Sequence, residues 1–220
     1  FVLEFLSASS ILFVHLSRFA EEMILWSSEE FSFIELPDRF CTGSSMMPQK
    51  KNPDVPELIR AKSGRVFGHL QALLTVMKGL PLAYNRDLQE DKVPLFDTVD
   101  TVKASLGMMR EMVEQIKVRK DRMLAAAQGG FMNATDLADY LVGRGLSFRS
   151  AHALVGRVVR FCLDHHRMIE ELSLNELKRF SPKIDKDVYT YLTAEAMVRR
   201  RQAVGGTALA NVRRRLKELR

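Results

Sequence analysis

The sequence LFDTVDTVKASLGMMREMVEQI, residues 95–116, repeats an apolar side chain at alternating steps of four and three residues. Such steps place side chains in one narrow stripe along an α-helix, as in the seam of a helical bundle. The stretch therefore predicts a long helix that packs in a bundle through this seam. The seam consists of Leu95, Val99, Val102, Leu106, Met109, Val113 and Ile116.

Two segments before this helix have the same helical character. Residues 56–78 carry apolar side chains at helical spacing, and Gly64 and Gly68 would let another helix approach closely. Gly79 and Pro81 are expected to end this helix. Residues 1–26 are apolar on nearly all sides as far as Arg18, which predicts a helix buried inside a bundle or an assembly.

After about residue 118 the pattern changes to shorter helices with frequent caps and turns. We expect helices at 135–144 and 147–166, a capping box at Ser173 and Glu176, and a last helix after Gly205 and Gly206. We find no internal repeat and no convincing strand. The sequence thus predicts an all-α fold, with part of a long-helix bundle in residues 1–118 and a small helical domain in residues 119–220.

Composition favours a soluble globular protein, because 46% of the 220 residues are hydrophobic, enough for a substantial core. The longest apolar run near the start, residues 5–16, is shorter than the roughly 20 residues that span a bilayer, so no membrane segment is expected. Cys41 and Cys162 show neither a pairing pattern nor metal-ligand spacing. This usage predicts a reducing, cytoplasmic location without a disulfide framework or a zinc site.

The net charge of +6 is unevenly distributed along the chain. Residues 196–220 hold eight Arg or Lys residues and one Glu, a balance of +7, which leaves the rest of the chain near −1. The clusters at 199–201 and 213–215 have helical character and no interleaved aromatic residues. We therefore expect a solvated face or a subunit contact there, and no nucleic-acid site.

Residues 43–54, GSSMMPQKKNPD, place two hydroxyls, two cations and an amide between turn-forming residues. Pro48 and Pro53 stiffen the segment, which lowers the entropy lost when it becomes ordered. Its polar side chains are suited to hold a carboxylate or phosphate through charge-assisted hydrogen bonds. The candidates are Ser44, Ser45, Lys50, Lys51 and Asn52.

This segment resembles the signature loop of the fumarase and aspartase superfamily, Gly-Ser-Ser-x-Met-Pro-x-Lys-x-Asn-Pro, at every fixed position. Its variable positions Gln49, Lys51 and Asp54 are similar to the argininosuccinate lyase family. Residues 78–92, KGLPLAYNRDLQEDK, and 134–142, ATDLADYLV, resemble the same family at matching separations. The resemblance covers essentially the whole chain.

The resemblance implies elimination of arginine from argininosuccinate to leave fumarate, without a cofactor or a metal. This chemistry needs a base for a weakly acidic proton next to a carboxylate, and cations that stabilise the negative charge that develops. By alignment with the family motif, Ser44 would be the base, Lys50 would stabilise the charge, and Ser45 and Asn52 would bind substrate.

Four more residues are assigned by the same resemblance. Tyr84, Gln89 and Lys92 align with substrate-binding residues of the family. Glu57 aligns with a glutamate that pairs with the catalytic histidine, but Asp54 and Glu57 also match a capping box at a helix start. Both roles of Glu57 stay open from the sequence alone.

None of the five histidines matches the catalytic histidine of the family, which lies in an earlier region. Because the chain opens at Phe1 without an N-cap, we expect a C-terminal fragment that lacks about half of a family member and is inactive by itself. The resemblance also implies a homotetramer whose active sites are shared between subunits. Two alternatives are another lyase of the superfamily, such as adenylosuccinate lyase, and a catalytically silent, crystallin-like structural protein.

Overall fold

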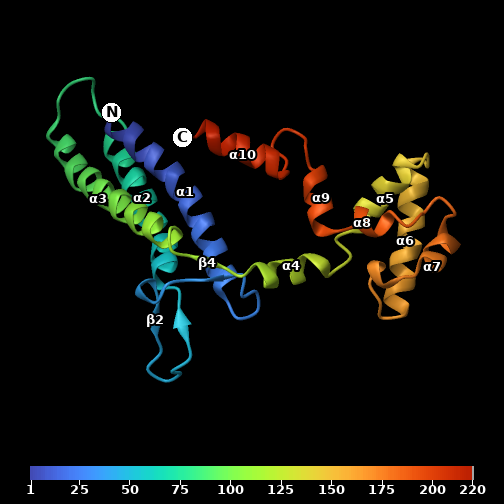
Figure 1. Ribbon diagram of the computed structural model, residues 1–220. Coiled ribbons are helices and arrows are strands. Elements are labelled where there is room, and N and C mark those ends of the chain that lie inside the picture. The colour runs from blue at the N-terminus through green and yellow to red at the C-terminus, as the bar shows by residue number, and fades with distance from the viewer. Residues whose placement is uncertain (220) are drawn as a thin grey trace. The chain divides into compact units, whose positions relative to one another are not determined.

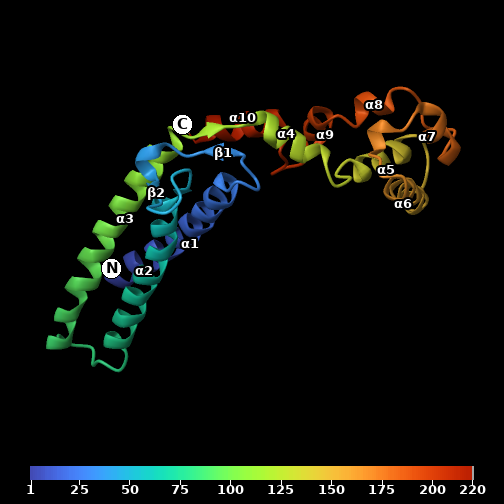
Figure 2. The ribbon, with the colours of Figure 1, turned by 90° about the horizontal axis from the view of Figure 1, so that it is seen from below.

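The computed structural model describes residues 1–219, so Arg220, the last of the basic residues counted above, lies outside the described residues. The chain divides into two compact units, Phe1–Arg122 and Met123–Arg220. Three long helices make up most of the first unit and lie side by side, as Figures 1 and 2 show. They are α1 (Val2–Ser27), α2 (Asp54–Met77) and α3 (Lys92–Val113).

The core of the first unit lies between these three helices. α1 contributes Phe13 and Ala20, both fully buried, and α2 contributes Val66, also fully buried. α3 adds Met109 and Met112 to the same cluster. Burial of apolar surface of this kind, at about 25 cal/mol per Å², is what holds long amphipathic helices together. The prediction of an all-α, long-helix fold is confirmed.

The face that α3 buries overlaps only in part with the predicted seam. The helix is buried at Thr98, Thr101 and Ser105, whose small side chains allow close approach of a neighbouring helix. Of the predicted seam, Leu106 and Val113 are 42% and 43% exposed. The seam thus packs in the bundle in part: Met109 is buried, and Val102 and Ile116 are half-buried against the same core, while Leu106 and Val113 stay open.

Helix α1 also keeps apolar side chains on the surface, among them Ile11, which is 62% exposed, together with Val14 and Phe19. With 26 residues, α1 is longer than the apolar run measured in the sequence and is long and apolar enough to cross a membrane by length and composition. A core helix of a soluble protein passes the same test. In this structure α1 packs against α2 and α3.

Four short strands interrupt the helical pattern, where the sequence predicted none. β1 (Ile34–Glu35) pairs antiparallel with β4 (Lys117–Val118), and β2 (Thr42–Gly43) pairs antiparallel with β3 (Lys51–Asn52). Each strand has two residues, too few for a period-2 pattern to show in the sequence. Two 3₁₀ helices, η1 (Asp38–Phe40) and η2 (Arg86–Asp91), complete the first unit.

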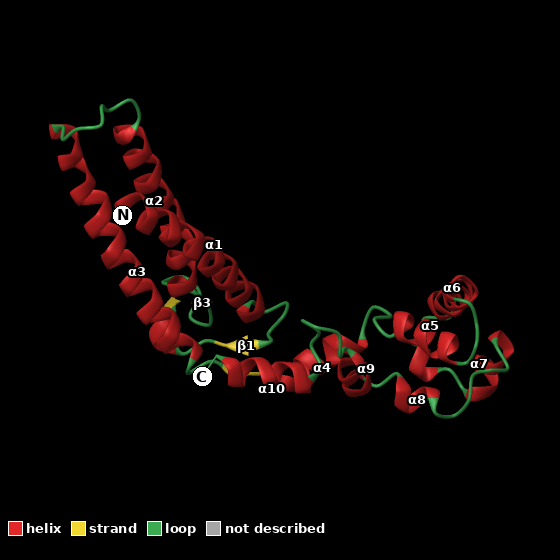
Figure 3. Cartoon of the chain, turned by 90° about the horizontal axis from the view of Figure 1, so that it is seen from above, coloured by secondary structure: helices red, strands yellow, loops and turns green. Residues whose placement is uncertain are grey.

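The second unit is built from short helices around its own core, and Figure 3 shows α5 to α8 gathered together. Its centre is made by Leu137, Leu141, Val158 and Ile184, all fully buried. The helices are α4 (Lys120–Gln128), which crosses the boundary between the units, α5 (Ala134–Gly143), α6 (Phe148–Asp164), η3 (Ile169–Glu171), α7 (Leu174–Phe180), α8 (Val188–Tyr191), α9 (Ala194–Arg200) and α10 (Leu209–Glu218).

Local signals place the ends of these helices. The Ser147 hydroxyl accepts a hydrogen bond from the Ser150 amide at 3.2 Å and begins α6. Gly145, with φ of 85°, follows α5 in a conformation that glycine adopts without strain. The predicted capping box is confirmed: the Ser173 hydroxyl accepts from the Glu176 amide, and the Glu176 carboxylate accepts from the Ser173 amide.

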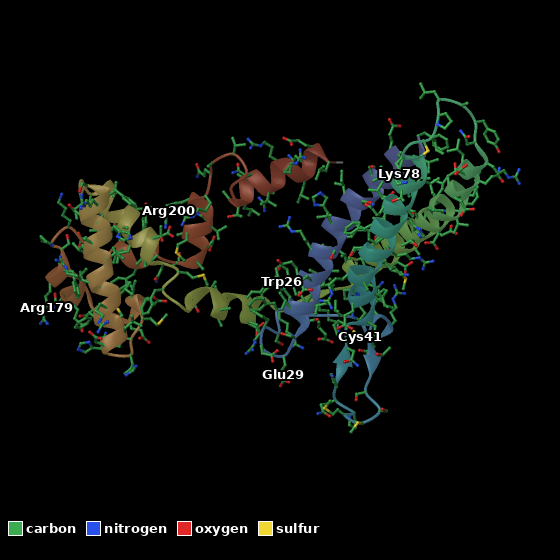
Figure 4. All side chains as sticks on the ribbon, turned by 180° about the vertical axis from the view of Figure 1, so that it is seen from behind. Trp26, Glu29, Cys41, Lys78, Arg179 and Arg200 are labelled. Carbon is green, nitrogen blue, oxygen red and sulfur yellow. The ribbon has the colours of Figure 1, made fainter. Side chains whose placement is uncertain are left out.

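A buried carboxylate ties α9 to α5. Asp136 is 1% exposed and accepts hydrogen bonds from Arg200 at 2.7 Å and from Arg201 at 2.6 Å. The Arg200 guanidinium also lies over the Tyr191 ring, 3.5 Å from its centroid, and Figure 4 marks Arg200 on α9. Removal of both guanidinium partners would leave the Asp136 carboxylate buried without a partner, which is unfavourable. Of the cluster expected to be a solvated face or a subunit contact, Arg200 is half-buried by its ion pair with Asp136, while Arg201 pairs with Asp136 and stays exposed.

Acid should weaken the second unit through Glu176. The Arg167 guanidinium, with added hydrogen bonds from Ser173, lowers the pKa of Glu176 from 4.5 to about 2. Because the folded pKa lies below the unfolded one, this carboxylate stabilises the fold above pH 4.5 and loses its effect as the pH falls toward about 2. We predict that Glu176→Gln flattens the fall in unfolding free energy over this window, measured by urea unfolding at a series of pH values.

The matched control is Glu195→Gln, which removes an exposed carboxylate paired with Arg199 one helical turn away. This control should leave the pH dependence of the parent chain unchanged. An equally steep acid loss in Glu176→Gln and in the parent would contradict the assignment of that loss to Glu176.

Candidate active site

The signature segment forms an exposed hairpin before helix α2. Strands β2 and β3 pair Thr42 with Asn52 and Gly43 with Lys51, and the intervening residues form the loop. Met46 at its tip is 88% exposed. The hairpin therefore presents the loop to its surroundings, and anion binding by the loop stays a prediction.

Ser44 is held at the start of this loop by the backbone. The amides of Met46 and Met47 donate hydrogen bonds to the Ser44 hydroxyl oxygen at 3.2 and 3.1 Å. The Lys50 amide then bonds the Met47 carbonyl at 3.0 Å. Two N–H donors aimed at one hydroxyl oxygen favour negative charge on that oxygen. The local geometry is thus suited to a serine that gives up its proton.

The two lysines of the loop differ in their surroundings. The Lys51 ammonium forms an ion pair with the carboxylate of Asp38. This hydrogen bond lowers the pKa of Asp38 and raises the pKa of Lys51. Lys50 makes no ion pair within residues 1–219 and is exposed. Within residues 1–219, Lys51 is thus engaged with Asp38 and Lys50 is not engaged, while anion binding by either lysine stays a prediction.

Asn52 and Glu57 lie where the hairpin meets α2. Both are half-buried, whereas Ser45 is exposed in the loop. Pro53 is the N-cap residue of α2, and no side chain makes a capping hydrogen bond there. The predicted capping box of Asp54 and Glu57 is therefore wrong. Both carboxylates lie in the first turn of α2, where the positive end of the helix dipole stabilises negative charge.

The second group of predicted residues lies on the connection from α2 to α3. Tyr84 is 71% exposed in the loop before η2, Gln89 is exposed in η2, and Lys92 is the first residue of α3. The Lys92 ammonium pairs with the carboxylate of Asp91. These three side chains are near one another in sequence and share one end of the three-helix bundle.

Helix α2 separates the two groups. It has 24 residues, which at 1.5 Å per residue makes about 36 Å. The hairpin precedes its first residue and the connection follows its last, and Figure 4 marks Cys41 and Lys78 at the opposite ends. The structure thus brings Ser44, Lys50 and Asn52 together but does not bring them to Gln89 or Lys92.

The remaining candidate groups are accounted for locally. His69 of α2 lies with its Nε2 atom 2.7 Å from the carboxylate of Asp97 on α3, and none of the five histidines bonds Glu57 within the described residues. Burial raises the pKa of the Cys41 thiol, which disfavours a reactive thiolate. Among residues 1–219, no group of three or more His, Cys, Asp or Glu side chains is arranged to hold a metal ion.

Sequence reasoning missed Asp38. It lies 13 residues before Lys51, in η1, and only the hairpin register brings the two side chains together. A lone Asp after a proline is typical of a turn, so no local signal distinguishes it.

Two family models match the chain. The model described as "Argininosuccinate lyase C-terminal" matches residues 131–199, and the model described as "Lyase" matches residues 1–68. The argininosuccinate lyase of Syntrophotalea carbinolica is 59% identical over 98% of this chain and 47% of its own length. That of Geotalea daltonii is 58% identical over all of this chain and 48% of its own length. The chain spans about half the length of the curated relatives it matches.

Solved structures give the same picture. A fumarate-bound variant of EDDS lyase has a TM-score of 0.85 and 26% identity, over 99% of this chain and 45% of its own. The class II fumarase of Schistosoma mansoni, at 18% identity, shares the fold alone, with a TM-score of 0.71 over 87% of this chain and 38% of its own. With its intact signature hairpin and its match to the C-terminal model, the chain belongs to the argininosuccinate lyase family and corresponds to the C-terminal part of its members.

Proposed function

We propose that this chain supplies two segments of the active site of an argininosuccinate lyase, which eliminates arginine from argininosuccinate to leave fumarate. The observation that carries the proposal is the hairpin. Its serine accepts two backbone hydrogen bonds beside an unengaged lysine, in a chain about 59% identical to curated argininosuccinate lyases. The fumarate bound to the related EDDS lyase variant is the product expected here.

In the proposed reaction, the Ser44 oxygen removes the proton from the carbon next to a carboxylate of the substrate. The electrons of that C–H bond form the new C=C bond, the C–N bond breaks, and the guanidino nitrogen leaves with a proton from a general acid. The backbone amides of Met46 and Met47 support this role because they stabilise a negatively charged serine oxygen.

The other residues of the hairpin would hold the substrate and its developing charge. Removing the proton places a second negative charge on the carboxylate end of the substrate, and the exposed Lys50 ammonium is suited to offset it. Asn52 and Ser45 would bind the substrate through the amide and hydroxyl. Glu57 would orient a histidine supplied from outside this chain.

We also propose that the active site is shared between subunits of a homotetramer. Tyr84, Gln89 and Lys92 are separated from the hairpin by the length of α2, about 36 Å, which exceeds the reach of any side chain. A site that uses both groups therefore needs the hairpin of one copy and the connection of another. Two-fold symmetry between copies can bring the hairpin end of α2 in one copy next to the connection end of α2 in another.

Apolar surface on the long helices supports such an assembly. Ile11 on α1, Leu58 on α2 and Phe96 on α3 are 62%, 59% and 61% exposed. A methyl group added at Gly64 or Gly68 would meet no neighbouring atom, so the close approach expected there is open to a helix of another copy. Large apolar side chains exposed on all three long helices support a subunit interface on this bundle.

A reducing, cytoplasmic location is part of the proposal. It is supported by Cys162, which is buried as a free thiol, and by Cys41, which is free and half-buried.

The proposal is tested with a chimera that joins this chain to the N-terminal part of the 59% identical relative from Syntrophotalea carbinolica. We predict that the chimera releases fumarate from argininosuccinate and that the 220-residue chain alone does not. Fumarate release is measured by its ultraviolet absorbance. Turnover of adenylosuccinate instead would assign another lyase activity. A folded chimera without either activity would favour the crystallin-like structural protein.

Within the chimera, Ser44→Ala should lower kcat by roughly 10²–10⁴ and change KM little, because a general base acts in the transition state. Ser45→Ala is the matched comparison and should raise KM more than it lowers kcat. If kcat collapses in Ser45→Ala and survives in Ser44→Ala, the proton-removing oxygen belongs to Ser45.

A further inference from the structure

The signature hairpin has one side-chain link to the rest of the first unit. Among residues 1–219, the hydrogen bonds of hairpin side chains are those that Ser44 makes within the loop and the one from Lys51 to Asp38. Only the bond from Lys51 leaves the hairpin. Asp38 is therefore the side chain outside the hairpin that is hydrogen-bonded to a hairpin side chain within the described residues.

Asp38 lies on a turn that is fastened to the helical core. Phe40, two residues later, is 3% exposed and belongs to the core between the long helices. Arg39 donates a hydrogen bond to Glu111 of α3 at 3.0 Å and lies 4.5 Å from the centroid of the Phe40 ring. Backbone bonds from Phe40 to Pro37 and from Cys41 to Asp38 close the turn. Asp38 is thus a fixed point for the ammonium of Lys51.

The hairpin register connects this fixed point to the proposed catalytic residues. Lys51 stands opposite Gly43, and Asn52 stands opposite Thr42. Because side chains alternate between the faces of a strand, a Lys51 directed to Asp38 places Asn52 on the other face. Ser44 directly follows Gly43, and Lys50 directly precedes Lys51. The ion pair therefore influences the orientation of the strand backbone that carries Ser44, Lys50 and Asn52.

The pair contributes to geometry rather than to stability. The side chains of Lys51 and Asp38 are 54% and 83% exposed, and exposed ion pairs typically add little to folding free energy. Two paired strands of two residues are by themselves marginal in water. The Asp38 carboxylate restrains this hairpin through Lys51. The restraint limits the positions that the loop can adopt and leaves the hydrophobic core unchanged.

We propose that Asp38 and Lys51 are positioning residues that orient the signature hairpin for catalysis. The inference rests on the proposed function of the hairpin and adds a role for the variable position between Lys50 and Asn52 of the motif. Neither side chain needs to touch the substrate. Lys50 and Ser44 act on the substrate, and the pair sets where they act.

The experiment uses the chimera described above with the variants Asp38→Asn, Lys51→Gln and the double variant. Loss of the Lys51–Asp38 ion pair should lower kcat by up to about fivefold in each single variant, because the pair restrains the hairpin only weakly, while catalysis is sensitive to displacements of about 1 Å at a reacting group. KM and the melting temperature should change little. The double variant should lose no more than either single variant, since both remove the same interaction.

Two further variants separate positioning from general damage. Lys51→Arg keeps the ion pair and should retain most of kcat. Asp164→Asn is the matched control, because it removes an exposed ion pair with Arg160 on α6 in the second unit, and it should leave kcat unchanged. A kcat in Asp38→Asn equal to that of the control, or losses that multiply in the double variant, would overturn the proposal.

Amide exchange keeps this test separate from the proposed function. Hydrogen exchange at residues 43–52 should be faster in Asp38→Asn than in the parent chimera or in Asp164→Asn. If the parent chimera releases no fumarate from argininosuccinate, the proposed function fails. Independently of that result, an unchanged exchange rate at residues 43–52 in Asp38→Asn would overturn the positioning role of the Lys51–Asp38 ion pair.

Discussion

The unbroken length of helix α2 is the constraint on which the rest of the structure depends. It runs from Asp54 to Met77 without a proline inside its later turns, and its rigidity keeps the signature hairpin and the α2–α3 connection about 36 Å apart. The same helix packs along α1 and α3 and so defines the first unit. A catalytic site that needs both ends of α2 is then necessarily built from more than one copy.

Local interactions explain why much of the fold could be predicted from the sequence. The helix expected at 147–166 is observed at Phe148–Asp164, because Ser147 caps its start through its own hydroxyl. Its apolar side chains Leu154, Val155, Val158 and Cys162 are buried as their spacing predicts. The local signals at Ser147 and Ser173 are confirmed, whereas the capping box read at Asp54 and Glu57 is not, because Pro53 takes the N-cap position there.

Interactions between distant segments could not be predicted in the same way. Asp136 meets Arg200 and Arg201 across more than 60 residues, and Asp38 meets Lys51 only through the hairpin register. The buried face of α3 includes Thr98 and Ser105, because burial depends on which helices lie beside α3. Apolar periodicity in the sequence alone favours the adjacent apolar stripe. For the candidate site, the motif in the sequence predicted which residues of segment 43–54 belong to it. The distance along α2 between this segment and the connection with Gln89 and Lys92 came from the structure.

The most direct test of the shared site mixes two defective forms of the chimera. Ser44→Ala disables the hairpin and Gln89→Ala disables the connection, so each form alone should be inactive. After joint unfolding and refolding, mixed oligomers should regain activity, because some sites then combine an intact hairpin from one copy with an intact connection from another. A mixture no more active than the two variants refolded separately would contradict the account.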